Sequence, residues 1–277
     1  MSIARIERYG LPFSNVAANN PSTGNVSPGK TIEAIRLALG GTAFTKAMIS
    51  NYKIRANGKP IIDVASGTDL EKINAYRGEP TDAAYLDVHF SDYSLNNEFD
   101  RHVGAFDTSL GIESITHEMD IGAATAPTLK QILWESGAQK DRGGNAAPFA
   151  PLIHKLLRSP FAQATAGQLP FTVPFGKQNG AIVKRIHIIH GGNMTAALVR
   201  ENGLTLHEST ATENAAMLTK FKRTPQANMY TIDFVKDGDI RKALDTRDSN
   251  SLEWLFTFSA ADSGRVYVEY LDTLGNL

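Results

Sequence analysis

The sequence predicts an all-β protein made of two copies of one sandwich. The first observation is a long internal repeat. The Asn57-Gly58 pair recurs as Asn202-Gly203 145 positions later, and a helix-like run that starts at Thr68 recurs at Thr212, 144 positions later. Solenoid units span only about 20–50 residues, so this period indicates the duplication of a whole domain.

The second observation is the alternation of apolar and polar residues that is typical of half-buried strands. Residues 252–259 place Leu, Trp, Phe and Phe at the even positions, and residues 265–270 alternate in the same way. Residues 86–90 and 230–234 each present one apolar face. Both Asn-Gly pairs are signals of type I′ hairpins, because both central residues of that turn need a positive φ.

Helices are few and short. We expect them at residues 68–77, 97–106, 211–221 and 239–244. Strands connected by short helices predict one all-β sandwich in each half.

The composition changes between the two copies, where an Ala-, Gly- and Thr-rich stretch leads into a run punctuated by proline. We place the domain boundary at Gly143-Gly144, which gives an N-terminal domain of residues 1–143 and a C-terminal domain of residues 144–277. Trp134 falls in the stretch that we assign to the linker.

The 277 residues suit two domains of ordinary size. The absence of cysteine excludes disulfides and thiolate metal sites. A formal net charge of −1 gives no electrostatic argument for nucleic-acid binding. The first eight residues lack the apolar core of a signal peptide, and no run reaches the ~18 apolar residues of a membrane span. We therefore expect a protein that is made in the cytoplasm and leaves it only within a larger assembly.

Residues 24–31, GNVSPGKT, match the phosphate-binding P-loop pattern completely. In such a loop Lys30 would reach the β- and γ-phosphates and Thr31 would hold Mg²⁺. A P-loop follows a buried parallel strand, however, whereas residues 17–23 have the composition of a turn. The run after Thr31 fits either a strand or a helix, and no alternating βα pattern follows. The context therefore argues against a P-loop ATPase.

The histidines give no metal site. His117 begins a segment that resembles the start of a metalloprotease helix, but the second histidine four residues later is missing, and the alternation favours a strand. His187 and His190 lie an odd number of residues apart in a predicted strand, so they face opposite sides of it.

Two further segments allow a functional and a structural interpretation. Asp237 and Asp239 offer carboxylates to a hard cation, although a solvated turn is the simpler interpretation. Residues 152–158 are basic and amphipathic, which suits either contact with an anionic membrane or a packed helix or strand edge. No Ser-His-Asp or paired-carboxylate arrangement can be assembled, so we assign no catalytic or cofactor-binding residue and no metal ligand.

A collinear set of short motifs runs along most of the chain: Asn15-Val16-Ala17-Ala18, Pro28-Gly29, Thr31, Glu33-Ala34-Ile35, Asn57-Gly58, the helix of residues 70–76, Tyr230-Thr231-Ile232-Asp233-Phe234, Gly238-Asp239 and Val268-Glu269-Tyr270. Through these motifs the chain resembles the major capsid protein of corticovirus-type bacteriophages, which build icosahedral shells around an internal lipid membrane. The GKT residues fall within the matching segment, where that family has a strand and no nucleotide.

The resemblance implies a tandem, or double, eight-stranded jelly roll with short helices in the connections. It implies a structural major coat protein and no enzyme. Three chains would form a homotrimer of pseudo-hexagonal outline that tiles the shell. The expected location is the virion, and the expected partners are other copies of the chain, vertex and minor capsid proteins and the internal membrane, without sequence-specific nucleic acid.

Two expectations remain open at this stage. Calcium at structural sites would be compatible with the resemblance, which transfers no ligand residue. Residues 146–174 are our candidate for contacts between subunits, because they are expected to lie outside the repeated core. The alternative function is a tandem jelly-roll protein that binds carbohydrate or another ligand, although Trp134 and Trp254 are poorly placed to form exposed binding platforms.

Overall fold

The computed structural model describes residues 5–109, 111–137 and 152–276. Its first half contains β1 (Ile6–Tyr9), β2 (Asn20–Val26), β3 (Thr31–Gly40), β4 (Ile49–Ala56), β5 (Lys59–Ser66), β6 (Tyr85–His89), β7 (Phe106–Asp107), β8 (Ile115–Ile121) and β9 (Thr128–Ser136). The helices of this half are α1 (Gly67–Tyr76) and α2 (Glu98–His102), with a short 3₁₀ turn, η1 (Lys46–Met48).

The second half contains β10 (Ile153–Gln163), β11 (Gly167–Phe171), β12 (Ile182–Ile189), β13 (Met194–Glu201), β14 (Leu204–Thr210), β15 (Met229–Asp233), β16 (Leu244–Asp245), β17 (Leu252–Phe258) and β18 (Asp262–Asp272). Its helix is α3 (Ala211–Lys220), and two 3₁₀ turns follow, η2 (Ile240–Lys242) and η3 (Thr246–Asp248).

The two halves have the same strand order. In the first, the strands run β1-β9-β3-β6 in one layer and β5-β4-β8-β2 in the other. In the second, the corresponding orders are β10-β18-β12-β15 and β14-β13-β17-β11. Each half is therefore an eight-stranded jelly roll with one additional two-residue strand, as the resemblance implied. We call strands β1–β9 the first roll and strands β10–β18 the second roll.

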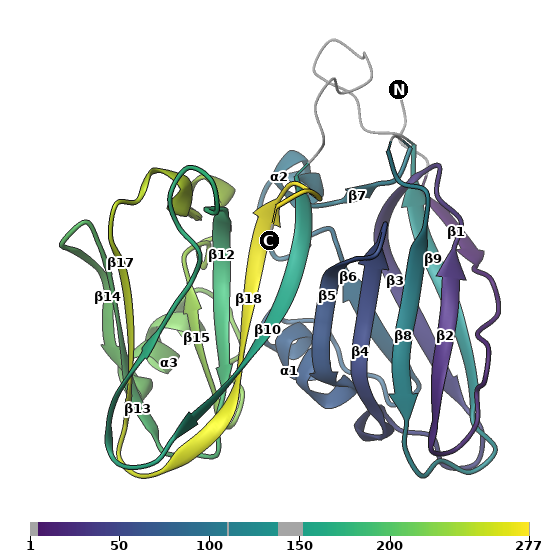
Figure 1. Cartoon of the computed structure of the whole chain (residues 1–277), viewed down its shortest axis with the longest axis horizontal. Helices are drawn as coiled ribbons and strands as arrows, with labels where there is room; N and C mark the ends of the chain where they lie inside the picture. The colour runs from purple at the N-terminus through teal and green to yellow at the C-terminus, as the bar shows by residue number, and fades with distance from the viewer. Residues whose placement is uncertain (1–4, 110, 138–151, 277) are drawn as a thin grey trace.

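The rolls are joined edge to edge. Strand β5 of the first roll pairs in parallel with β10 of the second through Leu156 and Ile62. Through this pairing one layer of each roll becomes part of a single nine-stranded sheet. Figure 1 shows the consequence for the shape: the rolls stand side by side, with β14 at one end of the molecule and β1 at the other.

The repeat extends to details of the backbone. Asn57 and Gly58 have φ values of 48° and 79°, and Asn202 and Gly203 have 49° and 83°, which confirms both hairpin turns. The pairing of β3 with β9 shifts register between Ile32 and Ala34, and that of β12 with β18 shifts between Val183 and Arg185. These shifts lie 151 residues apart, the spacing of the Gly40-Gly41 and Gly191-Gly192 pairs.

Burial follows the predicted alternation where one face of a strand meets solvent. In β17, Trp254, Phe256 and Phe258 are buried in the core of the second roll. Strand β18 departs from alternation, because residues from Val266 to Asp272 are all buried. The first roll covers the face of β18 that would otherwise be solvated.

The linker expected between the copies is wrong in large part. Trp134 lies in β9, the central partner of β1 and β3. Strands β10 and β11 fall within residues 146–174, yet they occupy the same sheet positions in the second roll as β1 and β2 in the first. The described part of that segment, residues 152–174, therefore does not lie outside the repeated core, which was our reason for expecting subunit contacts there. The predicted boundary at Gly143-Gly144 lies outside the described residues.

Three of the four predicted helices were located correctly, but their bounds differ from the predicted ones. Helix α1 begins at Gly67, because Ser66 caps it by accepting a hydrogen bond from the Asp69 amide at 3.1 Å. Helix α2 ends at His102, four residues before the predicted end, and the last predicted helix is only the 3₁₀ turn η2. No helix in the described part of the chain is long and apolar enough to cross a bilayer.

Candidate functional site

The P-loop-like motif spans the connection between β2 and β3. Its first residues lie in β2, which runs antiparallel to β8, and Thr31 begins β3, so the strand–loop–helix context of a P-loop is missing. The Thr108 hydroxyl accepts hydrogen bonds from the amides of Gly29 at 2.8 Å and Lys30 at 3.2 Å. The donors that would bind a phosphate are thus occupied by a side chain.

The two functional groups of the motif are also occupied. The Thr31 hydroxyl donates to the Gly137 carbonyl at 2.8 Å, and the Lys30 ammonium lies 3.7 Å from the Glu135 carboxylate. Our expectation of a turn before Gly24 was wrong, because β2 already begins at Asn20. Strand β2 is an edge strand, which is the place in a sheet that tolerates a proline such as Pro21.

The histidines are structural. His117 is fully buried in β8, as the alternation predicted, and its Nδ1 lies 2.9 Å from the Tyr52 hydroxyl. Burial lowers the pKa of His117 to about 3. His187 bonds the Glu269 carboxylate, whereas the Nδ1 of His190 accepts from the Gly192 amide. In residues 5–109, 111–137 and 152–276, no group of three or more His, Asp or Glu side chains could hold a metal ion.

The acidic turn is held by local cations. Arg241 donates two hydrogen bonds to Asp239, at 2.9 and 2.8 Å, and the Lys242 ammonium donates to Asp237. The hydrogen bonds from the Arg241 side chain and backbone lower the pKa of Asp239 to about 2. This is the solvated turn of the simpler interpretation.

The basic segment 152–158 is packed inside the sheet. It forms the start of β10, between β18 and β5, and Ile153, His154, Lys155 and Leu156 are buried. The Lys155 ammonium donates to Asp272 at 3.1 Å and to the Thr273 carbonyl at 2.6 Å. Of our two interpretations, the packed strand is therefore confirmed, because these side chains cannot reach a membrane surface.

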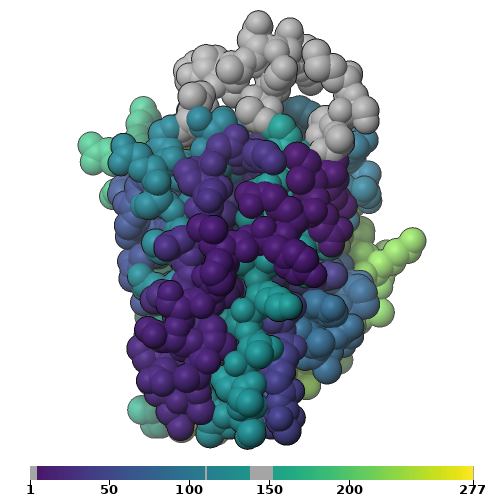
Figure 2. All heavy atoms as spheres, turned by 90° about the vertical axis from the view of Figure 1, so that its right-hand side faces the viewer, coloured from purple at the N-terminus to yellow at the C-terminus, as the bar shows by residue number. Residues whose placement is uncertain are grey.

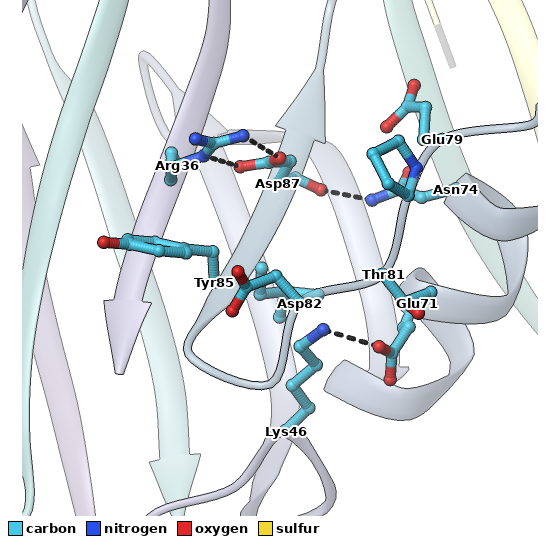
Figure 3. Close-up of a pocket in the computed structure, with 11 residues that line it drawn as sticks. Arg36, Lys46, Glu71, Asn74, Glu79, Thr81, Asp82, Tyr85 and Asp87 are labelled. Carbon is cyan, nitrogen blue, oxygen red and sulfur yellow. Dashed lines mark hydrogen bonds and ion pairs between the residues drawn. The ribbon is translucent and has the colours of Figure 1, made fainter. Parts of the chain in front are cut away.

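A polar pocket of about 250 Å³ lies on the first roll between α1, β3 and β6 (Figure 3). Arg36 holds the Asp87 carboxylate through two hydrogen bonds, at 2.7 and 2.8 Å, and Lys46 lies 2.5 Å from Glu71. The Asn74 amide donates to the Asp87 carbonyl at 2.7 Å. Both cations of the wall are thus paired with carboxylates of the wall, and the lining offers no nucleophile beside a general base.

The most developed polar cluster lies between the two rolls. We call it the junction network, and its charged members are Arg77 and Asp92 of the first roll and Lys184, Arg185, Arg223, Asp233 and Glu269 of the second roll. All seven are buried. Arg185 donates to Asp92 at 2.6 Å, to Asp233 at 3.0 Å and to Glu269 at 3.0 Å. One guanidinium from β12 therefore connects carboxylates that belong to both rolls.

Glu269 is the second centre of the network. Its carboxylate accepts from Arg77 at 2.6 Å, lies 3.7 Å from the Lys184 ammonium and bonds His187 at 2.9 Å. On the opposite side of the ring, His187 Nδ1 lies 2.9 Å from the Thr231 hydroxyl. A neutral imidazole suits both contacts, because it donates to the carboxylate and accepts from the hydroxyl.

The opposite charges of the network offset the cost of burying one another. Burial opposes ionisation of Asp92 and Glu269, yet the surrounding cations hold the pKa of both carboxyls well below the usual range. Burial lowers the pKa of His187, against the effect of Glu269, and also lowers the pKa of Lys184, against the effect of Asp92. Buried charges persist only when they are paired in this way.

Sequence reasoning missed the junction network. Lys184 and Arg185 interrupt β12, whose other residues are apolar except for His187, and this pair of charges in a buried strand was the one available signal. Their partners Asp92 and Glu269 are 92 and 84 residues away from Lys184 and Arg185, respectively. The pattern of one strand cannot show that a second roll covers it.

Comparisons with known proteins agree with this architecture. A family model of the viral coat protein P2 N-terminal domain matches residues 8–134, and one of the viral coat protein P2 C-terminal domain matches residues 153–274. A comparison with curated protein sequences gives no match.

The solved structures that match are capsid proteins. The crystal structure of the major capsid protein P2 from bacteriophage PM2 has a TM-score of 0.85 at 20% identity, covering 98% of each chain. The STIV MCP has a TM-score of 0.68 at 15% identity over 97% of each chain. The PBCV-1 virus capsid gives 0.63 at 11% identity, over 97% of this chain and 94% of the other. These likenesses establish the fold.

The two family models together take in both rolls, from β1 to the end of β18. The P-loop-like motif, the histidines and the acidic turn are all used in holding the fold. The chain belongs to the family of the viral coat protein P2: it is a structural protein of the virion shell with a double jelly-roll fold, and not an enzyme.

Proposed function

We propose that this coat protein forms a homotrimer of pseudo-hexagonal outline, which tiles an icosahedral shell around an internal lipid membrane. The observation that carries the proposal is the duplication itself: one chain presents two rolls of equal strand order, side by side in one sheet. Three such chains around a threefold axis supply six similar wedges, and closed cyclic symmetry is the usual arrangement of identical chains.

Light scattering at micromolar concentration tests the trimer directly. We expect a mass three times that of the 30.0 kDa chain, which persists on dilution because obligate interfaces are large. A mass of one chain that remains unchanged on concentration would contradict the proposal.

Family membership supports a proposal for the remaining partners. We propose that the shell contains vertex and minor capsid proteins beside this chain, and that its inner surface faces the membrane. Electron cryomicroscopy of purified particles is the test. A shell without a bilayer beneath it, built from trimers alone, would refute this part.

We also propose that a division at residues 143 and 144 separates the chain into two domains. The strands of each roll pair mainly with one another, and the β5–β10 pairing is the direct strand contact across the division. Limited proteolysis of the purified protein should yield fragments that end near this position. First cleavage within a roll would argue against it.

A further inference from the structure

We propose that the free edge of β14 in one copy of the chain pairs in parallel with the free edge of β1 in the next copy. The pairing would repeat, between chains, the geometry by which β5 pairs with β10 within the chain. This inference rests on the proposed assembly into trimers and names the surface that builds them.

The first step is the equivalence of the strands. Strand β14 occupies the position in the second roll that β5 occupies in the first, and β1 occupies the position of β10. Within the described chain, β5 and β10 complete each other, whereas β14 pairs only with β13 and β1 pairs only with β9. Each molecule therefore carries an unpaired edge equivalent to that of β5, which is β14, and an unpaired edge equivalent to that of β10, which is β1.

The second step is the placement of these edges. They lie at opposite ends of the molecule (Figure 1), and Figure 2 looks directly at the end formed by first-roll segments, β1 among them. An interface between two different patches at opposite ends is a head-to-tail interface. Such an interface forms a ring when the rotation between copies closes, and a filament when it does not.

The third step is the exposure of apolar residues at both edges. Leu204 and Leu206 of β14 are 67% and 37% exposed, and Tyr9 and Leu11 at β1 are 72% and 48% exposed. These are four of the eight large apolar residues that the described chain exposes. Exposed apolar side chains gathered on an unpaired strand edge favour strand addition.

Equivalent positions at the internal junction are buried. The counterpart of Leu206 is Ile61, which is 0% exposed, and the counterpart of Met217 on α3 is Ile73 on α1, also 0% exposed. Met217 itself is 44% exposed. The same positions are thus covered where two rolls meet and uncovered at the free end.

The fourth step is charge complementarity. Across the internal junction, Arg265 of β18 donates to Asp69, the third residue of α1, at 2.7 Å. The counterpart of Arg265 is Lys130 on β9, and the counterpart of Asp69 is Glu213, the third residue of α3. Both counterparts are exposed and of opposite charge. Docking by the same geometry therefore brings a lysine of one copy to a glutamate of the next.

The pocket in Figure 3 belongs to the same surface. Its residue Arg36 corresponds to His187, whose ring lies 5.3 Å from that of Tyr76 on α1. Helix α1 thus covers the equivalent place on the second roll. In the proposed assembly, α3 of the neighbouring copy covers the pocket, which explains why a polar hollow of this size is open on the first roll.

The register of the pairing can be stated by residue. Leu156 of β10 lies opposite Ile62 of β5. The strand registers make Glu7 the counterpart of Leu156 and His207 the counterpart of Ile62. Glu7 of one copy should therefore lie opposite His207 of the next, at a Cα separation that suits a disulfide, about 4.4–6.8 Å.

The chain has no cysteine, so any disulfide formed by a variant must join the cysteines that were introduced. We expect the double variant Glu7→Cys/His207→Cys to give, on mild oxidation, covalent species up to three chains, which a reductant returns to single chains. Each single variant should give none. The matched control is Glu7→Cys/Glu253→Cys, because Glu253 is exposed in the same layer as β14 but on the interior strand β17, and it should also give none.

A second variant tests the surface without a disulfide. Leu206→Glu places a charge on the β14 edge and should reduce the light-scattering mass from three chains to one, with an unchanged circular dichroism spectrum. Phe99→Glu, at an apolar residue of α2 that is even more exposed than Leu206, should keep the trimer.

The outcomes separate the two proposals. A wild-type trimer with no cross-link at residues 7 and 207 and no effect of Leu206→Glu overturns the edge pairing but leaves the trimer standing. A cross-linked ladder without an upper limit supports the pairing and refutes closure into trimers. A wild-type monomer overturns both.

Discussion

Replacing Glu269 with Gln tests whether the junction network holds the rolls together. The substitution keeps the shape of the side chain but removes the charge that faces Arg77 at 2.6 Å, Arg185 at 3.0 Å and Lys184 at 3.7 Å. Glu269 is 0% exposed, so water cannot replace the lost charge. Breaking a buried pair by removing one partner costs about 3–5 kcal/mol.

The balance of charges places Glu269→Gln at the upper end of that range. The four cations of the network, Arg77, Lys184, Arg185 and Arg223, would face only Asp92 and Asp233. A matched control is Glu253→Gln, because Glu253 makes a 3.4 Å ion pair with Arg200 in which both side chains are about half exposed. Exposed pairs contribute only about 0–1 kcal/mol.

Urea unfolding is the suitable assay, because urea does not screen charges as guanidinium does. Trp134 in the first roll and Trp254 in the second give a fluorescence signal from each half. We expect Glu269→Gln to lower the unfolding free energy by about 5 kcal/mol and to separate the transitions of the two rolls. A loss no larger than that of Glu253→Gln would refute the stabilising role of the network.

Three further predictions concern the P-loop-like turn and the buried His117. Lys30→Ala should leave ATP turnover at zero. It should change the unfolding free energy by less than about 0.5 kcal/mol, because Lys30 lies at the surface and its ammonium makes only a long ion pair with Glu135, at 3.7 Å. Thr108→Val should lower the unfolding free energy by more, about 1–3 kcal/mol, since it leaves two amides of the turn without an acceptor. Equal losses for Lys30→Ala and Thr108→Val in urea unfolding would contradict this. Stability should also fall as the pH decreases below about 6.5, because His117, with a pKa of about 3, stays neutral in the fold while the unfolded chain binds the proton. The expected slope is about 1.4 kcal/mol per pH unit for each such histidine, and His117→Gln should reduce it by that amount, whereas an unchanged slope would refute the assignment.

The repeat was predictable because it rests on local chemistry. Asn57-Gly58 and Asn202-Gly203 need a backbone that few other pairs adopt easily, so the hairpins could be located without a structure. The alternation in β17 and β8 was equally local, and it correctly placed Trp254 and His117 on core faces.

The errors arose where burial depends on distant parts of the chain. Strand β18 lost its alternation because the first roll covers its second face, and Lys184 and Arg185 are buried for the same reason. The start of strand β2 was taken for a turn because residues 17–23 have the composition of one, although an edge strand accepts a proline such as Pro21. Strand β10 was assigned to a linker because of the composition and prolines of that stretch, and its partners β5 and β18 lie far from it in sequence.

The β5 edge has a consequence for synthesis on the ribosome. All strands of the first roll lie before residue 137, so it can fold before β10 has left the ribosome, and β5 then exposes an unpaired edge. Because β1 and β10 are equivalent strands, β1 of another nascent chain can compete for that edge and start a wrong polymer. Covalent connection places β10 at a high effective concentration near β5, which favours the intramolecular partner. Joining two rolls in one polypeptide therefore protects the growing chain from premature association as well as supplying two rolls to the shell.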